Sequence, residues 1–188
     1  LGGIYMNTKK GQVINAAKEL FIKYGYRKVS MDEIAKESGV TKKTIYTYFK
    51  DKNDLIKYFV YDELEKMKQT TKKIDKKNIS FEDKLHEMIE IQMDYRNNSK
   101  ILKSLLKDAG SDKIADECEE ILNMSIRNDL KTNLDLAIKE GHIKNCDTEI
   151  VSFLIYKIYI ALMFELDKQI DKKEATENIM NILQAWLL

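Results

Sequence analysis

The chain has 188 residues, 44% of them hydrophobic and 34% charged, which suffices for one large or two small domains with an apolar core. It contains no proline and seven glycines, so long helices can run without internal breakers, and we expect an all-α fold of about nine helices. The two cysteines, Cys118 and Cys146, form no CxxC pair, which argues against a disulfide framework, a zinc site or any other metal or cofactor.

The net charge of +1 conceals an uneven distribution along the chain. Residues 1–58 carry 12 Lys and Arg against 6 Asp and Glu, whereas residues 59–188 carry 20 against 25. A basic first third before an acidic remainder is typical of a small nucleic-acid-binding module joined to a body that does not touch nucleic acid. Chance clustering in a lysine-rich chain is the alternative when charge is considered alone.

The N-terminus has none of the features of a secretory signal, so we expect a cytoplasmic protein with reduced thiols. We expect residues 1–7 to be disordered or derived from a tag. From residue 8 to residue 24, apolar positions such as Val13, Ala17 and Phe21 form a helical stripe, and Gly25 is placed to end this helix.

Two short helices joined by a tight turn are predicted between residues 30 and 49. Ser30 and Glu33 form a capping-box pattern, which marks the start of the first of them. Gly39 suits a left-handed turn, and Thr41 is suited to cap the second helix. This arrangement of helix, turn and helix is one that enters the major groove of DNA.

The second of these helices turns polar and aromatic side chains outward. Ile45 and Phe49 are placed to pack inward, while Tyr48 can put its ring inside and its hydroxyl outside. Hydroxyls, phenols, lysines and helix N-termini bind phosphates, and lysine and aromatic side chains reach base edges. The candidate DNA contacts are Ser30, Thr41, Lys42, Lys43, Thr44, Tyr46, Thr47, Tyr48 and Lys52.

Residues 41–55, TKKTIYTYFKDKNDL, resemble the DNA-binding signature of TetR-type transcriptional regulators, and residues 16–21 with Gly25 resemble that family's first helix. The resemblance covers residues 10–58. It implies a helix-turn-helix DNA-binding domain, here residues 1–50, before a helical domain for effector binding and dimerisation, here residues 51–188. It also implies phosphate contacts at Ser30, Thr41, Tyr48 and Lys52.

The rest of the chain is predicted to form further helices. The fourth begins at residues 51–53 and runs towards Thr71, and the polar run 72–78 marks its end and a domain boundary. Later helices are expected over residues 80–98, 99–109, 112–141, 147–166 and 172–188. Residues 150–166 are apolar on all sides, but Lys157 and Glu165 argue against a membrane span, so this helix should be buried.

One body of this size covers one face of each of the last two helices, and the remaining apolar faces call for a second subunit. We therefore expect a two-fold dimer through a four-helix interface, as the TetR resemblance also implies. The interface candidates are Phe153, Ile160, Ile179, Leu183 and Trp186.

The resemblance further implies a small-molecule pocket in the body. Candidate lining residues are Met88, Gln92, Tyr95, Cys118, Tyr156, Lys157 and Met163, although methionine and tyrosine at helical spacing are more often core residues. Lys157 either extends to the surface or pairs with an anion, from a ligand or from Glu165.

These features predict a ligand-responsive transcriptional regulator that binds palindromic double-stranded DNA as a homodimer. Repression and release by a small, largely apolar effector are what the resemblance implies. The alternatives are a DNA-binding regulator or architectural protein of the same fold without an effector, and a helical adaptor. An enzyme is not expected, because His86 and His142 lack partners for a catalytic set and no Gly-rich phosphate loop is present.

Overall fold

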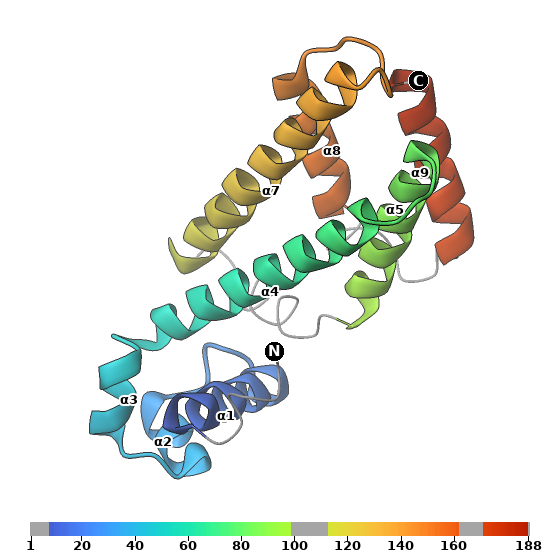
Figure 1. Cartoon of the computed structure of the whole chain (residues 1–188). Helices are drawn as coiled ribbons and strands as arrows, with labels where there is room; N and C mark the ends of the chain where they lie inside the picture. The colour runs from blue at the N-terminus through green and yellow to red at the C-terminus, as the bar shows by residue number, and fades with distance from the viewer. Residues whose placement is uncertain (1–7, 99–112, 162–170, 188) are drawn as a thin grey trace. The chain divides into compact units, whose positions relative to one another are not determined.

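The computed structural model describes residues 8–98, 113–161 and 171–187, and it is all-α in these ranges (Figure 1). The eight described helices are α1 (Lys9–Tyr24), α2 (Met31–Ser38), α3 (Lys42–Tyr48), α4 (Lys52–Asp75), α5 (Phe81–Asn98), α7 (Lys113–Lys139), α8 (Thr148–Ile160) and α9 (Lys172–Leu187). The predicted fold class is therefore confirmed. The short helix expected over residues 99–109 lies outside the described residues.

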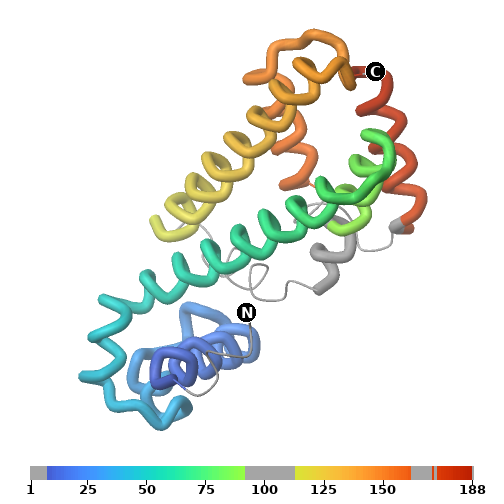
Figure 2. Tube along the Cα trace, in the orientation of Figure 1, coloured from blue at the N-terminus to red at the C-terminus, as the bar shows by residue number. Residues whose placement is uncertain are grey.

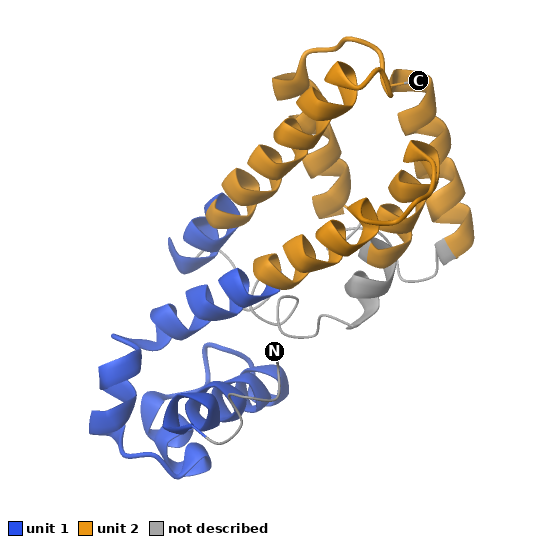
Figure 3. Ribbon diagram, in the orientation of Figure 1, with its two compact units in different colours: residues 1–63, 100–120 blue, residues 64–99, 121–188 orange. Residues whose placement is uncertain are grey.

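The chain divides into two compact units (Figure 3). Unit 1 comprises Leu1–Glu63 and Lys100–Glu120, and unit 2 comprises Leu64–Ser99 and Ile121–Leu188. The division therefore falls inside α4 and inside α7. This division is based on compactness, and it places the first turns of α4 in unit 1. It does not test the boundary between the DNA-binding and effector-binding domains expected at residue 50, which stays a prediction.

The core of unit 1 forms around α1. The Thr8 side chain accepts a hydrogen bond from the Gly11 amide at the start of this helix, as an N-cap does. Val13, Ala17 and Phe21 are buried at the predicted helical spacing. The Phe21 ring meets the rings of Tyr26 and Phe59 edge-on, with centroids 5.9 Å and 6.1 Å away. These aromatic pairs bind α1 to the following turn and to α4.

The predicted capping box and tight turn of the next two helices are confirmed. The Ser30 hydroxyl accepts a hydrogen bond from the Glu33 amide, and the Glu33 carboxylate accepts one from the Ser30 amide, at 3.2 Å and 2.8 Å. Gly39 has φ +65° and ψ +15°, a left-handed conformation that side chains with a Cβ rarely adopt. Thr41 caps α3 by accepting a hydrogen bond from the Thr44 amide.

Helix α4 extends further than the sequence pattern indicated, to Asp75 rather than Thr71. Ile74 is buried and anchors the last turn, so the polar residues around it remain helical. Thr70 and Thr71 donate hydrogen bonds to the carbonyls of Lys66 and Met67, one turn earlier, and so do not interrupt the backbone ladder.

Unit 2 has its own apolar core. Helices α5 and α9 lie side by side (Figures 1 and 2). The buried residues of this cluster are Ile89, Leu134, Ala137, Ile143, Met180, Leu183 and Leu187. The Phe81 ring stacks on the His142 ring at 5.3 Å, and the Lys144 amide donates to the Leu187 carbonyl at 2.8 Å. These contacts fasten the start of α5, the loop before α8 and the end of α9 to one another.

Helix α8 is held at its start by Asp147, whose side chain accepts hydrogen bonds from the amides of Glu149 and Ile150. The Glu149 carboxylate binds Arg127 and Lys131 of α7. Ile150, Phe153 and Leu154 are exposed in the single subunit, so the expectation that this helix is buried on all sides stays a prediction that depends on the second subunit. None of the helices in the described ranges has both the length and the hydropathy that a membrane crossing requires.

Candidate nucleic-acid interface

Helix α3 has an inward face and an outward face. Ile45 and Phe49 are buried, whereas Tyr46 and Tyr48 are 46% and 42% exposed. The expectation that the Tyr48 ring packs inside is therefore corrected. Phe49 lies just past the helix with extended φ and ψ of −136° and 121°, and its ring packs edge-on against Tyr58. Because Phe49 occupies the inward position, Tyr48 faces outward.

The hydroxyl groups of the predicted interface lie at the starts of α2 and α3. Ser30 and Thr41 are exposed, and each uses its hydroxyl to cap its own helix. The Thr41 and Thr44 hydroxyls are 2.9 Å apart, and the Thr47 hydroxyl donates to the Thr44 carbonyl at 2.6 Å. The N-terminus of α3 therefore presents hydroxyls together with backbone amides, a combination that binds phosphate oxygens.

The two lysines at the start of α3 are both exposed. The Lys42 ammonium is 2.8 Å from the Asp32 carboxylate of α2, and this hydrogen bond raises the pKa of Lys42. Asp32 was not among the predicted site residues, since no periodicity indicates that α2 and α3 would bring it to Lys42. This pair neutralises part of the positive charge that α3 would otherwise offer.

Lys52 differs from the other predicted contacts. Its ammonium donates hydrogen bonds to the backbone carbonyls of Tyr26 and Val29, at 2.9 Å and 2.8 Å. It also lies 4.3 Å from the centre of the Tyr26 ring. Burial lowers the pKa of Lys52. A phosphate contact at Lys52 stays a prediction.

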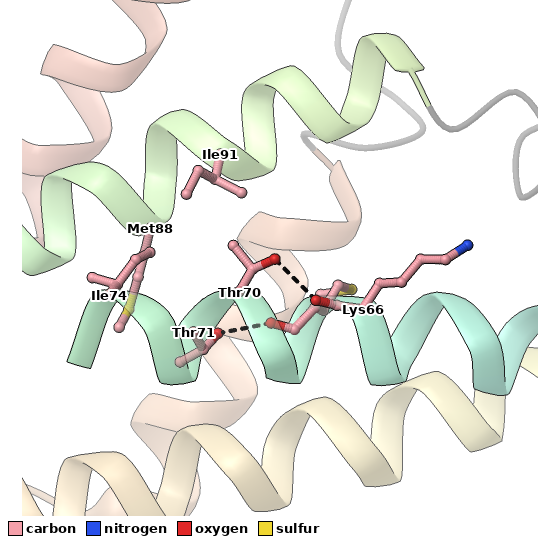
Figure 4. Close-up of a pocket in the computed structure, with 7 residues that line it drawn as sticks. Lys66, Thr70, Thr71, Ile74, Met88 and Ile91 are labelled. Atoms are coloured by element: carbon pink, nitrogen blue, oxygen red, sulfur yellow. Dashed lines mark hydrogen bonds between the residues drawn. The ribbon is translucent and has the colours of Figure 1, made fainter. Parts of the chain in front are cut away.

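A small cavity of about 40 Å³ lies in unit 2 (Figure 4). Residues of α4 and of α5 face each other across it, and the Lys66 amine points away from the others. Met88 is the residue of the predicted effector site that lines this cavity. The full lining is Lys66, Met67, Thr70, Thr71, Ile74, Met88 and Ile91.

The other predicted effector residues have different surroundings. Cys118 is buried within unit 1, and burial raises the pKa of its thiol to about 11. Tyr156 is buried in unit 2, whereas Lys157 is exposed, with its ammonium 5.8 Å from the centre of the Phe153 ring. The first of the two alternatives for Lys157, extension to the surface, is the one observed. Met163 and the side chains of Gln92 and Tyr95 lie outside the described residues.

The residues predicted for the dimer interface fall into three groups according to their exposure. Phe153 and Trp186 are 40% and 48% exposed. Ile160 and Ile179 are half-buried, and Ile179 packs against the core of unit 2. Leu183 is only 3% exposed and belongs to that core. The prediction of Leu183 as an interface residue is therefore corrected, because its side chain packs within its own subunit.

The geometry defines a helix-turn-helix module, and comparisons with known proteins identify its family. Residues 13–59 match the family model of bacterial regulatory proteins of the tetR family. The HTH-type transcriptional regulator YhgD of Bacillus subtilis is 30% identical over 185 residues, which span 96% of this chain and 95% of that protein. The chain belongs to the TetR family. It is a DNA-binding transcriptional regulator and not an enzyme.

Solved structures show the same fold along nearly the whole chain. GusR of Salmonella enterica has a TM-score of 0.74 at 18% identity and covers 95% of this chain and 98% of its own. The regulator FadR of Bacillus subtilis, solved in complex with stearoyl-CoA, has a TM-score of 0.67 at 24% identity. The similarity to FadR covers 92% of this chain and 96% of that one. At these identities the likeness concerns the fold alone.

Proposed function

We propose that the protein is a ligand-responsive repressor that binds a palindromic operator as a homodimer and is released by a small, largely apolar effector. The proposal rests above all on the outward face of α3. The contacts proposed to DNA are Ser30, Thr41, Lys42, Lys43, Thr44, Tyr46, Thr47, Tyr48 and Lys52, which are exposed except for the half-buried Thr44 and Lys52. Thr41 and Ser30 would bind phosphates, while Lys43 and Tyr46 would reach base edges.

A homodimer follows from the uncovered apolar side chains of α8 and α9. Ile150, Phe153 and Leu154 are exposed on α8, and Ile182 and Trp186 are exposed on α9. Such side chains on two adjacent chain segments are suited to an isologous four-helix contact with a second copy. A two-fold dimer carries two reading helices, so its operator should be palindromic, with half-sites separated by a helical turn of DNA or a multiple of it.

The effector is proposed to be a small, largely apolar molecule. An acyl-CoA, which has an apolar acyl chain on a charged coenzyme A moiety, is the first candidate to test, because the similar regulator FadR was solved with stearoyl-CoA. The cavity of about 40 Å³ between α4 and α5 is far smaller than ligand pockets of about 300–1,000 Å³. Among the described residues, that small volume favours a second candidate function, in which a regulator of the same fold binds DNA without a small-molecule effector.

Selection of bound sequences from random duplex DNA tests the proposed function. We expect a palindromic consensus in the absence of ligand and weaker binding to it when stearoyl-CoA or another acyl-CoA is added. Unchanged binding in the presence of every acyl-CoA would favour the second candidate. Enrichment of no sequence would contradict both. A promoter carrying the consensus, fused to a reporter, then distinguishes repression from activation.

Tyr46→Ala is expected to reduce affinity for the selected operator about 10- to 100-fold, because a good base contact contributes roughly 1–3 kcal/mol. Fluorescence anisotropy with labelled operator gives the dissociation constant, and sedimentation shows whether the dimer persists. Tyr61→Ala removes a similarly exposed phenol from α4 and should leave the affinity unchanged. Full affinity in Tyr46→Ala would show that this side of α3 does not face the bases.

A further inference from the structure

We propose that Asp32 is a positioning residue that gives the helix-turn-helix part of its specificity, because it holds the ammonium of Lys42 in one place for the contact with DNA. Asp32 lies in the first turn of α2, and Lys42 is the first residue of α3. The DNA-binding part of this inference rests on the proposed function, whereas the placement of Lys42 by Asp32 does not.

The ion pair between Asp32 and Lys42 joins the starts of the two helices across the turn. The Lys42 Nζ atom lies 2.8 Å from Asp32 Oδ1 and 2.9 Å from Asp32 Oδ2, although the residues are 10 positions apart in sequence. The stem of Lys42 begins next to Thr41, the cap of α3, so both ends of this side chain are held. The ammonium is therefore directed toward α2 before any DNA is bound.

A lysine held in this way keeps its capacity to bind DNA. An ammonium has three N–H donors, and the hydrogen bonds to the two carboxylate oxygens use at most two of them. At least one donor therefore remains for a phosphate or a base edge. The Lys42 and Asp32 side chains are 46% and 73% exposed, so the pair is accessible from solvent. Asp32 thus restricts where the ammonium lies without removing Lys42 from the proposed contacts.

Asp32 is available for this role because the neighbouring acid is engaged elsewhere. Glu33 accepts hydrogen bonds from the amide and the hydroxyl of Ser30, both at 2.8 Å, within the capping box. The Asp32 carboxylate takes no part in this box, and it lies at a helix start, where the helix dipole favours a negative charge. The two acids therefore act separately: Glu33 fixes the backbone of α2, and Asp32 fixes a side chain of α3.

Positioning of Lys42 should matter for the operator and not for other DNA. Non-operator DNA is bound through phosphate attraction without a fixed register, so the charge of the module decides that affinity. In the operator complex, Lys43 and Tyr46 are proposed to fix the register of α3, so Lys42 meets the duplex at one place. An ammonium that is already held there loses less conformational entropy on binding. Removal of the carboxylate should therefore strengthen non-operator binding and weaken the preference for the operator.

Asp32→Asn tests the role in specificity. Fluorescence anisotropy at one salt concentration gives the dissociation constants for a non-operator duplex and for the selected operator. We expect the ratio of the first to the second to fall about 5- to 10-fold, because each of two subunits loses an exposed ion pair. Glu37→Gln removes the same charge from an exposed position in the last turn of α2 and should leave the ratio unchanged. An unchanged ratio in Asp32→Asn, or an equal fall in Glu37→Gln, would overturn the proposal.

A Lys42→Met background shows whether Asp32 acts through Lys42. Adding Asp32→Asn there should raise the affinities for both duplexes by the same factor and leave their ratio unchanged, because no ammonium remains to be positioned. A further fall in the ratio would contradict the proposal, since Asp32 would then act on DNA directly or through the structure of α2. Exposed ion pairs contribute little to stability, so a Tm within about 2 °C of the wild type is expected for each variant.

Competitive acetylation of the free protein tests the placement of Lys42 without DNA. The hydrogen bond to Asp32 raises the pKa of Lys42, and acetic anhydride attacks the neutral amine. We therefore expect Lys42 to react about threefold more slowly in the wild type than in Asp32→Asn, with the exposed Lys43 as internal reference in mass spectrometry. Equal relative rates in the two proteins would overturn the proposal. Failure of the wild type to bind any duplex would instead contradict the proposed function, and acetylation would still decide the placement.

Discussion

Phe21→Ala is expected to lower the free energy of unfolding of unit 1 by about 3–5 kcal/mol, the usual cost of replacing a buried phenylalanine by alanine. Phe21 is fully buried, and its ring packs edge-on against Tyr26 and Phe59. Its removal leaves a cavity among α1, the following turn and α4. Urea denaturation followed by circular dichroism measures the change in the free energy of unfolding. Amide hydrogen exchange measures this change separately for unit 1.

The matched control for Phe21 is Tyr24, an aromatic residue of the same helix that is half exposed. Tyr24→Ala should change the free energy of unfolding by no more than about 0.5 kcal/mol, as is usual for surface positions. Equal destabilisation by the two variants would contradict the placement of α1, since the side of the helix that faces the core would then be misassigned.

Trp186→Glu is expected to dissociate the proposed homodimer. Trp186 is 48% exposed in the single subunit, and a carboxylate placed without a partner inside an apolar interface is strongly unfavourable. We expect the dimer dissociation constant to rise at least about 100-fold, which corresponds to roughly 3 kcal/mol. Sedimentation equilibrium over a range of protein concentrations measures this constant, and circular dichroism verifies that the subunit remains folded.

Met124→Glu is the control for this substitution. Met124 is also an exposed apolar residue of unit 2, but it lies on α7, which is not one of the two helices of the proposed interface. Its variant should dimerise like the wild type. If Trp186→Glu remains dimeric, the interface lies elsewhere, and if Met124→Glu also dissociates the subunits, α7 takes part in it.

The local features of the fold were predictable because they depend on residues close in sequence. Ser30 and Thr41 were identified as caps from their side chains alone, and each accepts the expected amide hydrogen bond. Gly39 was placed in a left-handed turn, which its φ of +65° confirms. Helical periodicity likewise identified the buried positions of α1. For the two caps, the deciding hydrogen-bond partner lies within four residues.

The incorrect predictions concern choices that local patterns do not determine. Apolar residues cover both sides of α9, so periodicity could not show that Leu183 packs inside the subunit while Trp186 faces outward. The end of α4 depends on the burial of Ile74, a tertiary contact that extends the helix through a polar sequence. The contact of Lys52 with Val29 requires closure of a long loop, and no sequence motif within the run 41–55 indicates it.

The surroundings of the two cysteines have a practical consequence for solution experiments. With a pKa of about 11, the buried Cys118 thiol carries roughly one thiolate per ten thousand molecules at pH 7. Cys146 is half-buried ahead of α8, and its pKa is also raised, chiefly by burial. Maleimide reagents should therefore attach a fluorophore at Cys146 in the natural sequence, while slow alkylation of Cys118 would report transient opening at the beginning of α7.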